Sequence, residues 1–497
     1  MSATPTSTVA ETLGRSRVAI ENVTPQVDCG RFPIKRVTGD FVRVEADIFG
    51  DGHDGIGAAL LHRFGDSGEW RPTPMRFLIN DRWTAEFAVD NVGQYQYKVA
   101  GWIDHFGTWK RDLAKRINAS QDVSVELLIG AEMVHRSAAD AQDGDRERLE
   151  EWDRQLRGER ARAQPRSIAD SEELSTLMAR WFKPVVRAES REFSVVVDRP
   201  RASFSAWYEM FPRSAGKDGK HGTLKDVETC LPYVASMGFD VLYLPPIHPI
   251  GRTHRKGRNN AEQATPDEVG SPWGIGSEEG GHKAIHPALG TMDDFHSLIT
   301  AAQKHGLELA LDIAFQCSPD HPYVREHSEW FRKRPDGTIQ YAENPPKKYQ
   351  DIYPLDFETE AWESLWQELK SVFLFWIDHG IRIFRVDNPH TKPFPFWEWV
   401  IAEIRRDHPD VLFLAEAFTR PKIMYRLAKA GFSQSYTYFA WRDTKWELTK
   451  YFTDLTQTSI REFFRPNLWP STPDILPESL QFGGRAAFMT RLVLAAT

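Results

Sequence analysis

Apolar and polar residues alternate along the first part of the chain. Within residues 41–49 every second side chain is apolar, and the same period of two returns in residues 83–89 and 95–99. Gly, Asn and Asp turn signals separate these runs. A period of two indicates half-buried antiparallel strands. We therefore predict a flexible tail over residues 1–28, followed by an immunoglobulin-like β-sandwich over residues 29–122.

From about residue 122 the apolar residues recur every three or four positions, which is typical of helices. We assign residues 123–200 to a helical hairpin or spacer, in which Asp170 and Glu173 form a capping box and Pro184 ends the last helix. The charged segment 143–162 fits the solvated side of this hairpin. Its apolar face is an alternative surface for pairing with another subunit, so we expect a homodimer. The apolar positions are Leu149, Trp152, Leu156, Leu174, Leu177, Met178 and Trp181.

After Pro200, short apolar strands alternate with amphipathic helices, a pattern that predicts a parallel sheet with helices outside it. Seven strands at this spacing indicate a TIM-type (β/α)8 barrel over residues 201–497. Long connections over residues 245–287 and 317–357 are expected to build the active site. The predicted strands cover residues 204–211, 241–244, 307–313, 381–387, 411–416 and 435–439, with a seventh ending near Asp474.

The last segment, residues 485–497, has the pattern of a helix after the seventh strand. An eighth strand is then missing. A barrel without its last strand has unpaired edges, so we expect either an incomplete barrel or a fragment of a longer protein.

Composition narrows the class of protein. The chain has 497 residues, so several domains are expected. Its 62 Lys and Arg against 70 Asp and Glu leave a net charge of -8, which disfavours nucleic acid as a partner. We find no secretory signal and no apolar run long enough to span a membrane. Three distant cysteines indicate neither a disulfide framework nor a zinc site, so we expect a cytoplasmic protein.

Four carboxyl groups follow predicted strands: Asp312, Asp387, Glu416 and Asp474. The carboxyl ends of barrel strands share one rim, and barrel enzymes place their catalysis there. A single acidic residue at a strand end is more often a helix cap or an ion-pair partner. Four at one rim favour an active site.

Two of these carboxyl groups have contrasting surroundings. Arg385 and Asp387 are two apart on a strand, so their side chains project to the same side and the cation keeps the carboxylate ionised. From these two residues alone, a buried structural ion pair is the alternative. Glu416 follows an apolar strand, where desolvation raises the pKa of a carboxyl and suits it to donate a proton. Such a pair indicates glycoside chemistry, and in the retaining version of that chemistry the two carboxyls lie about 5 Å apart.

These motifs resemble those of the alpha-amylase superfamily, glycoside hydrolase family 13: Asp312, Arg385-Val-Asp387, Glu416 and Thr472-Pro-Asp474. Within that superfamily the chain is most similar to the alpha-1,4-glucan:maltose-1-phosphate maltosyltransferases, from about Phe32 to Thr497. The segments that carry this similarity are Leu311-Asp-Ile-Ala-Phe-Gln-Cys-Ser-Pro-Asp-His-Pro322, Arg385-Val-Asp-Asn-Pro-His-Thr-Lys-Pro393 and Asn344-Pro-Pro-Lys-Lys-Tyr349.

The resemblance implies a role for each catalytic position. Asp387 is the expected nucleophile, Glu416 the general acid and base, and Asp474 a third carboxylate that grips sugar hydroxyls. Arg385 is the partner of the nucleophile. The donor in that family is alpha-maltose 1-phosphate, whose phosphate the positions matching Lys256, Asn344, Lys347 and Tyr349 would hold. Gln316 and Asn388 are expected to contact sugar hydroxyls near the scissile bond.

Some positions depart from general amylases. Gln316-Cys317 replaces the Asn-His pair at the end of the first motif, and Pro473 replaces the His before the final Asp. Both replacements fit the maltosyltransferase branch. Residues 468–471 differ from the Asn-containing stretch expected there. The alternative interpretation of the charged residues 255–258 and 347–348 is that they are ordinary solvated loop charges. It would be the default if these loops did not follow barrel strands.

The expected function is retaining transfer of maltosyl from maltose 1-phosphate to the non-reducing end of an alpha-1,4-glucan, with release of phosphate. The chemistry calls for no metal and no organic cofactor. A retaining alpha-glucan hydrolase or isomerase on the same scaffold is the first alternative. A non-catalytic glucan-binding protein is the second, and only the missing strand favours it.

Overall fold

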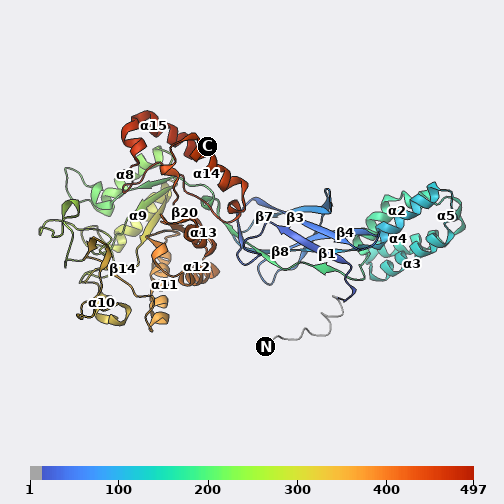
Figure 1. The fold of residues 1–497 in the computed structure, drawn as a ribbon, viewed down its shortest axis with the longest axis horizontal. Coiled ribbons are helices and arrows are strands. Elements are labelled where there is room, and N and C mark those ends of the chain that lie inside the picture. The colour runs from blue at the N-terminus through green and yellow to red at the C-terminus, as the bar shows by residue number, and fades with distance from the viewer. Residues whose placement is uncertain (1–13) are drawn as a thin grey trace. The chain divides into compact units, whose positions relative to one another are not determined.

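The computed structural model describes residues 14–497, which form two compact units (Figure 1). The first unit comprises the described residues up to Gln26 with Phe41–Ala88 and Gln94–Val195; the second comprises Val27–Asp40, Val89–Gly93 and Val196–Thr497. Part of the predicted tail, residues 1–13, lies outside the described residues. The rest of that prediction is wrong, because Val18–Thr24 forms strand β1, rich in apolar residues.

The first unit contains the predicted antiparallel strands. One sheet has the strand order β1-β3-β7-β6. In the other sheet, β8 pairs with β4 and with β9, and β4 also pairs with β5. The alternation in residues 41–49 is confirmed, since Val42, Val44, Ala46 and Ile48 are fully buried. The remaining strands are β3 (Asp40–Gly50), β4 (Gly55–Phe64), β5 (Arg71–Pro74), β6 (Arg76–Phe77), β7 (Arg82–Val89), β8 (Gly93–Asp104) and β9 (Ala188–Glu189).

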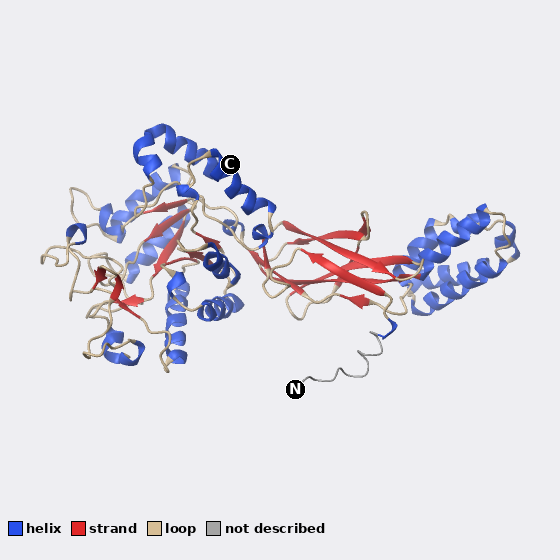
Figure 2. Ribbon diagram, viewed as in Figure 1, coloured by secondary structure: helices blue, strands red, loops and turns tan. Residues whose placement is uncertain are grey.

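Six helices of the first unit, α2 to α7, gather at one end of these strands. Helices are coloured blue in Figure 2. The helical part begins earlier than its predicted start near residue 122, because α2 follows β8 directly and Asp104 caps it by accepting from the Gly107 N–H. Ser171, not Asp170, caps α7. The helices bury a common core around Leu127 and Leu149. They are α2 (His105–Asn118), α3 (Ser124–Asp140), α4 (Asp143–Arg157), α5 (Glu159–Ala163), α6 (Arg166–Ala169) and α7 (Glu172–Trp181).

Strand β10 (Phe193–Asp198) leads into the second unit, which also holds β2 (Ile34–Val37). The second unit is built on a parallel sheet with the order β11-β12-β13-β18-β19-β20. Five predicted strands are thereby confirmed in position, whereas the predicted strand 435–439 overlaps β20 only at Ser435. The strands follow one another across the sheet in the order in which they occur along the chain, as in a TIM barrel. The strands are β11 (Trp207–Glu209), β12 (Val241–Leu244), β13 (Glu308–Ile313), β18 (Ile383–Val386), β19 (Leu412–Ala415) and β20 (Gln434–Ser435).

Helices follow these strands, as the sequence pattern predicts. Three of them, α8, α9 and α14, begin with capping boxes at Thr223, Thr291 and Thr444. The helices are α8 (Leu224–Ser236), α9 (Met292–Lys304), α11 (Trp362–Asp378), α12 (Phe394–Asp407), α13 (Pro421–Lys429), α14 (Lys445–Gln457) and α15 (Glu478–Ala496), with short turns η1 (Pro200–Ala202), η2 (Pro212–Ala215), η5 (Pro389–Thr391), η6 (Phe439–Trp441) and η7 (Ser459–Glu462).

The predicted seventh strand is wrong. Beyond β20 the next pairing is a single parallel bridge between Ser435 and Pro466, and Asp474 lies in a turn that a bridge between Thr472 and Ile475 closes. Proline lacks the N–H that a sheet requires, and Pro466, Pro470, Pro473 and Pro477 interrupt this stretch.

The two predicted long connections carry small elements of their own. They contain η3 (Arg258–Asn260), β14 (Gln316–Cys317), α10 (Pro322–Glu326), η4 (Ser328–Trp330), β15 (Ala342–Asn344), β16 (Lys347–Tyr349) and β17 (Tyr353–Pro354). Among the described residues, no helix combines the length and apolar character that crossing a bilayer requires.

Candidate active site

Three neighbouring strands bring together Asp387 and Glu416, two of the three predicted catalytic residues, with Asp312 and Arg385. Asp312 on β13 lies opposite Arg385 on β18, and Val386 lies opposite Ala415 at the end of β19. Asp387 and Glu416 each occupy the position directly after these strand ends. Because the strands are parallel, all of these residues lie at the carboxyl edge of the sheet, as the sequence predicts for a barrel active site.

Arg385 binds three carboxyl groups at once. Its Nη1 lies 2.8 Å from Asp312 Oδ2 and 2.9 Å from Asp387 Oδ1, while its Nη2 lies 2.9 Å from Glu416 Oε1. The side chains of Arg385 and Asp312 are almost completely buried. One guanidinium therefore holds Asp387 and Glu416 side by side, which is the arrangement that a pair of catalytic carboxyls needs.

The remaining oxygens of Asp387 and Glu416 contact Asn388. The Asn388 main-chain N–H donates to Glu416 Oε2 at 3.1 Å, and its Nδ2 donates to Asp387 Oδ2 at 3.3 Å. The structure thus places Asn388 in the predicted site, with its polar groups on the two carboxyls.

The two carboxyls differ in their readiness to ionise. Burial opposes ionisation of Asp387, but the positive charges of Arg385 and Lys392 outweigh it and hold its pKa below the usual value. Burial raises the pKa of Glu416 to about 8, helped by the charge of Asp387 and opposed by Arg385. A charged carboxylate beside a protonated carboxyl is the division of labour that retaining glycoside chemistry uses.

Asp312 lies beneath this pair. Burial raises its pKa to about 7, against the opposing charge of Arg385. The Tyr243 hydroxyl and Arg385 Nη1 both donate to its Oδ2. Asp312 is thus a buried support of Arg385.

Aromatic rings enclose the guanidinium. The Arg385 Cζ lies 5.7 Å from the ring centre of Tyr243 and 5.6 Å from that of Tyr436, distances at which a cation is attracted to a ring face. Trp469 packs edge-on against Tyr436 at 4.7 Å. The segment that carries Asp474 therefore runs beside the site.

Asp474 itself is exposed on its turn rather than at a strand end. Its negative charge contributes to raising the pKa of Glu209, so these two groups lie close enough to interact. Glu209 ends β11, and burial is the main cause that raises its pKa to about 7. Sequence reasoning missed Glu209, although it is an acidic residue within a predicted strand.

The predicted phosphate-binding residues form a second group. Asn344 and Lys347 are paired neighbours in the hairpin of β15 and β16, and Tyr349 ends that hairpin. Lys256 is buried, and its Nζ donates to Gln350 Oε1 at 2.9 Å and to the Lys348 carbonyl at 3.4 Å. Lys256 therefore lies beside the strand that carries Lys347 and Tyr349.

Gln316 lies in β14, three residues beyond the end of β13. Its Nε2 donates to the Trp273 carbonyl at 3.1 Å. This bond ties the connection 245–287 to β14, where the connection 317–357 begins, close to the strand that carries Asp312.

Among the described residues, His282, Cys317 and His321 form a buried group with metal-ligand atoms within 4.8 Å of one another. Their hydrogen bonds argue against a metal. His321 Nδ1 accepts from the Tyr323 N–H at 3.0 Å, so its Nε2 carries the proton and donates to His282 Nδ1 at 3.0 Å. His282 Nε2 in turn donates to the Ala314 carbonyl at 2.9 Å. Every ring nitrogen is satisfied, and the group supports the loop after β13.

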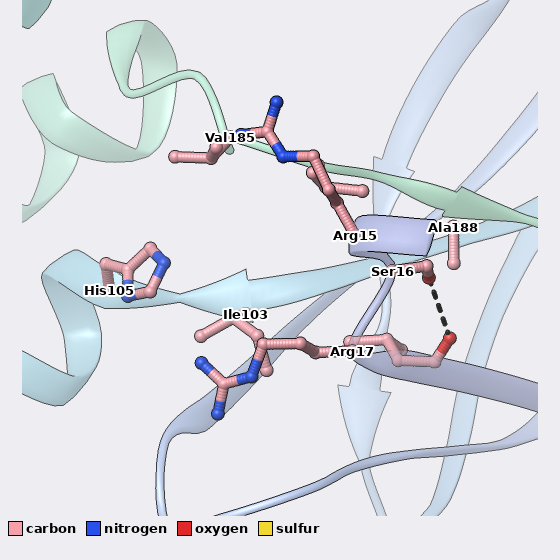
Figure 3. A pocket seen from close by; sticks show the side chains of 9 residues that line it. Arg15, Ser16, Arg17, Ile103, His105, Val185 and Ala188 are labelled. Carbon is pink, nitrogen blue, oxygen red and sulfur yellow. Dashed lines mark hydrogen bonds between the residues drawn. The ribbon is translucent and has the colours of Figure 1, made fainter. Parts of the chain in front are cut away.

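A cavity of about 110 Å³ lies in the first unit, where Arg15, Arg17 and His105 line it (Figure 3). Arg17 is neutralised by Asp51 at 2.7 Å and Asp54 at 2.9 Å. None of the predicted site residues lines this cavity, so it does not belong to the active site.

Lys392 is a further residue that sequence reasoning did not single out. Its Nζ donates to the Asn388 carbonyl at 3.4 Å, and its charge acts on Asp387 and Glu416. Its place in the segment 385–393 could have identified it, because a lysine just after a catalytic strand lies close to the carboxyl edge of the sheet.

Two protein-family models match parts of the chain. Residues 16–199 match the family model "Alpha-1,4-glucan:maltose-1-phosphate maltosyltransferase, domain N/S", and residues 165–368 match "Alpha amylase, catalytic domain". The second match supports a TIM-barrel-like fold for the parallel sheet. Among solved structures, an alpha-amylase from Lactobacillus plantarum is similar, with 23% sequence identity and a TM-score of 0.49. The match covers 59% of this chain and 69% of that chain.

The curated relatives are more similar. The alpha-1,4-glucan:maltose-1-phosphate maltosyltransferase of Chlorobaculum tepidum is 54% identical over 485 residues, which cover 97% of this chain and 72% of that protein. The enzyme of the same name from Methylacidiphilum infernorum is 52% identical over 487 residues, covering 97% of this chain and 73% of that protein. With this identity over nearly its whole length, the chain belongs to the alpha-1,4-glucan:maltose-1-phosphate maltosyltransferase family.

Proposed function

We infer that this chain transfers a maltosyl unit from alpha-maltose 1-phosphate to the non-reducing end of an alpha-1,4-glucan and releases phosphate. The relatives that share about half of its residues carry this activity in their names. The observation that carries the inference is the pair of carboxyls that Arg385 binds, Asp387 with a lowered pKa and Glu416 with a raised pKa.

In the first step, an Asp387 oxygen attacks the anomeric carbon while the bond from that carbon to the phosphate oxygen breaks. Glu416 donates its proton to the departing oxygen. The products are free phosphate and a maltosyl ester of Asp387. The lowered pKa of Asp387 keeps the nucleophile ionised, and the raised pKa of Glu416 keeps the acid protonated at neutral pH.

In the second step, Glu416 is a carboxylate and accepts the proton of a glucan 4-hydroxyl. The oxygen of that hydroxyl attacks the anomeric carbon, and the ester bond to Asp387 breaks. Both catalytic groups return to their starting states, and the configuration at the anomeric carbon is retained after two inversions.

The phosphate-binding role belongs, by the resemblance, to Lys256, Asn344, Lys347 and Tyr349. Two lysines and two neutral donors offer charge-assisted hydrogen bonds that stabilise phosphate as it leaves. Gln316 and Asp474 are the proposed contacts to sugar hydroxyls, the role that the resemblance also implies for Asn388. The proximity of Lys256 to the β15–β16 hairpin supports grouping these residues in one subsite.

We further propose the finer architecture expected from the sequence: a sandwich, a helical spacer and a (β/α)8-type catalytic domain, assembled as a cytoplasmic homodimer. The antiparallel strands of the first unit support the sandwich, and the helical core around Leu127 supports the spacer. Size-exclusion chromatography with light scattering tests the dimer, and a single monomer mass would contradict it.

Phosphate release measured with maltose 1-phosphate and a maltooligosaccharide acceptor tests the function. We expect phosphate and glucans lengthened by two glucose units. Reducing sugar without dependence on phosphate would instead identify a hydrolase or isomerase. Donor binding without any turnover, unchanged in Asp387→Ala, would identify a glucan-binding protein.

A further inference from the structure

Asn388 has an unusual backbone for a residue next to a catalytic carboxylate. Its φ of 42° and ψ of 52° lie in the left-handed region, which Asn tolerates better than most residues that carry a side chain. This conformation lets its main-chain N–H reach Glu416 Oε2 while its Nδ2 reaches Asp387 Oδ2. One residue therefore donates to both catalytic carboxyls.

The contacts of Asn388 complement those of Arg385. Arg385 binds Oδ1 of Asp387 and Oε1 of Glu416, whereas Asn388 binds Oδ2 of Asp387 and Oε2 of Glu416. Each carboxyl plane is consequently fixed by a donor at both of its oxygens. Asp387 Oδ2, which meets a neutral amide at 3.3 Å rather than a guanidinium at 2.9 Å, retains more of the negative charge and is the better nucleophilic oxygen.

The Asn388 peptide is itself fixed. Its carbonyl accepts from the Thr391 N–H at 3.1 Å, from the Thr391 hydroxyl at 2.8 Å and from Lys392 Nζ at 3.4 Å. These bonds do not involve the Asn388 side chain. A substitution that removes only the amide therefore retains these bonds to the carbonyl, and it also retains the main-chain N–H that donates to Glu416 Oε2.

We propose that Asn388 is a positioning residue for the transfer reaction, which orients Asp387 Oδ2 toward the anomeric carbon and Glu416 toward the departing oxygen. This assignment rests on the roles proposed above for Asp387 and Glu416. It differs from the role that the family resemblance implies for Asn388, which is a contact to sugar hydroxyls. The amide acts on the enzyme's own carboxylate, so its loss affects chemistry more than donor binding.

The pH dependence of the reaction separates these two roles. The amide donates to the ionised form of Asp387, so its removal makes ionisation less favourable and moves the acid limb of kcat/KM to higher pH. A sugar contact has no such effect. The other titratable and charged groups around the two carboxyls stay the same in the variants: Glu209 on β11, Tyr243 on β12, Asp312 on β13, Arg385 on β18, His390 in η5, Lys392 just after η5 and Tyr436 after β20.

The experiment measures phosphate release by the full chain for Asn388→Ala and Asn388→Gly. We expect both variants to lower kcat roughly 10-fold or more, the effect of losing a hydrogen bond to a charged group. The donor KM should stay within about twofold, and the acid limb should move upward. Asn80→Ala is the matched control, because Asn80 is also left-handed, with φ 51°, but lies on an exposed turn of the first unit. It should behave as the parent chain.

Three results would overturn the proposal. A normal Asn388→Gly beside an impaired Asn388→Ala would show that backbone strain is the cause. A raised donor KM with an unmoved acid limb would identify a sugar contact. Unchanged kcat in both variants would show that the amide has no role.

Folding and the underlying roles are checked separately. Thermal unfolding of each variant reports its fold, and Asn388→Ser, which keeps a donor on a short side chain, should recover part of kcat if Ala and Gly are unstable. A failure of the proposed roles is distinguishable, because it would appear as normal turnover in Asp387→Ala with Asn388 intact.

Discussion

Asp312 and Arg385 lie opposite one another on β13 and β18, with Asp312 Oδ2 2.8 Å from Arg385 Nη1. The same guanidinium also binds Asp387 and Glu416. Three ionised carboxylates around one guanidinium, two of them buried and Glu416 partly buried, would carry excess negative charge in a poorly solvated place, so at least one of them holds a proton. This crowding explains why one member of the catalytic pair can be an acid while its neighbour is a nucleophile.

Removal of the central cation should affect both stability and catalysis. In Arg385→Met, the buried Asp312 and Asp387 and the partly buried Glu416 lose their common partner, and breaking a buried pair costs about 3–5 kcal/mol. We expect a lower unfolding free energy by at least that amount in urea titration and no measurable turnover. Arg43→Met is the control, because the ion pair of Arg43 with Glu86 is exposed and should change stability by less than about 1 kcal/mol. Equal losses in the two variants would contradict this account.

The pH profile should show the two catalytic groups. Glu416 must be protonated in the first step, so kcat should fall as the pH rises through about 8. Asp387 must be ionised, so activity should persist down to a pH below the ordinary Asp pKa of 3.8, as far as the fold allows. In Glu416→Gln the limb near pH 8 should disappear and the rate should fall about 100- to 10,000-fold. If the limb survives in this variant, another group is the acid.

Neighbouring lysines of β16 should differ in their effect on donor binding. Lys347 and Tyr349 share one face of the strand and Lys348 has the other, because side chains alternate along a strand. We expect Lys347→Met to raise the donor KM about 10-fold through the loss of a charged hydrogen bond to phosphate. Lys348→Met removes the same charge and should leave KM within twofold. Equal effects of both variants would indicate only a general electrostatic attraction.

A glycine beside the histidine group should be intolerant of a side chain. Gly276 has φ +105°, and a Cβ there would overlap the His321 ring. Gly337 has a similar φ of +84° but open space around it. Backbone strain costs about 1–3 kcal/mol in both Gly→Ala variants, so Gly276→Ala should unfold at clearly lower urea concentration than Gly337→Ala. Matching midpoints would show that His321 moves aside without cost.

The sequence predicted much of the fold because its periods are strong. Fully apolar runs such as Val241–Leu244 and Leu412–Ala415 are buried on both faces and form parallel strands, as expected. The prediction failed where individual residues, such as prolines and helix caps, decide the backbone conformation and the periodicity of apolar residues does not. Four prolines prevent a regular strand near Asp474, and the Ser171 side chain, rather than that of Asp170, reaches the first turn of α7.

The candidate site was predictable at the ends of strands and less so between them. Strand pairing places Arg385 beside Asp312, and the residues that follow the strand ends become neighbours in the same way. The contacts of Asn388 depend on a left-handed backbone, which sequence reasoning did not anticipate. Glu209 acts through space on groups far from it in the sequence, so no local pattern marked it. Lys392 lies five residues after Asp387, and only its place just beyond a catalytic strand marked it.

Mass spectrometry of the chain incubated with a 2-fluoro maltosyl donor tests the central claim most directly. The account predicts a covalent maltosyl adduct on the peptide that contains Asp387, formed by the parent chain and absent from Asp387→Ala. An adduct on another residue, or release of phosphate without any adduct under conditions where the ester should accumulate, would contradict it.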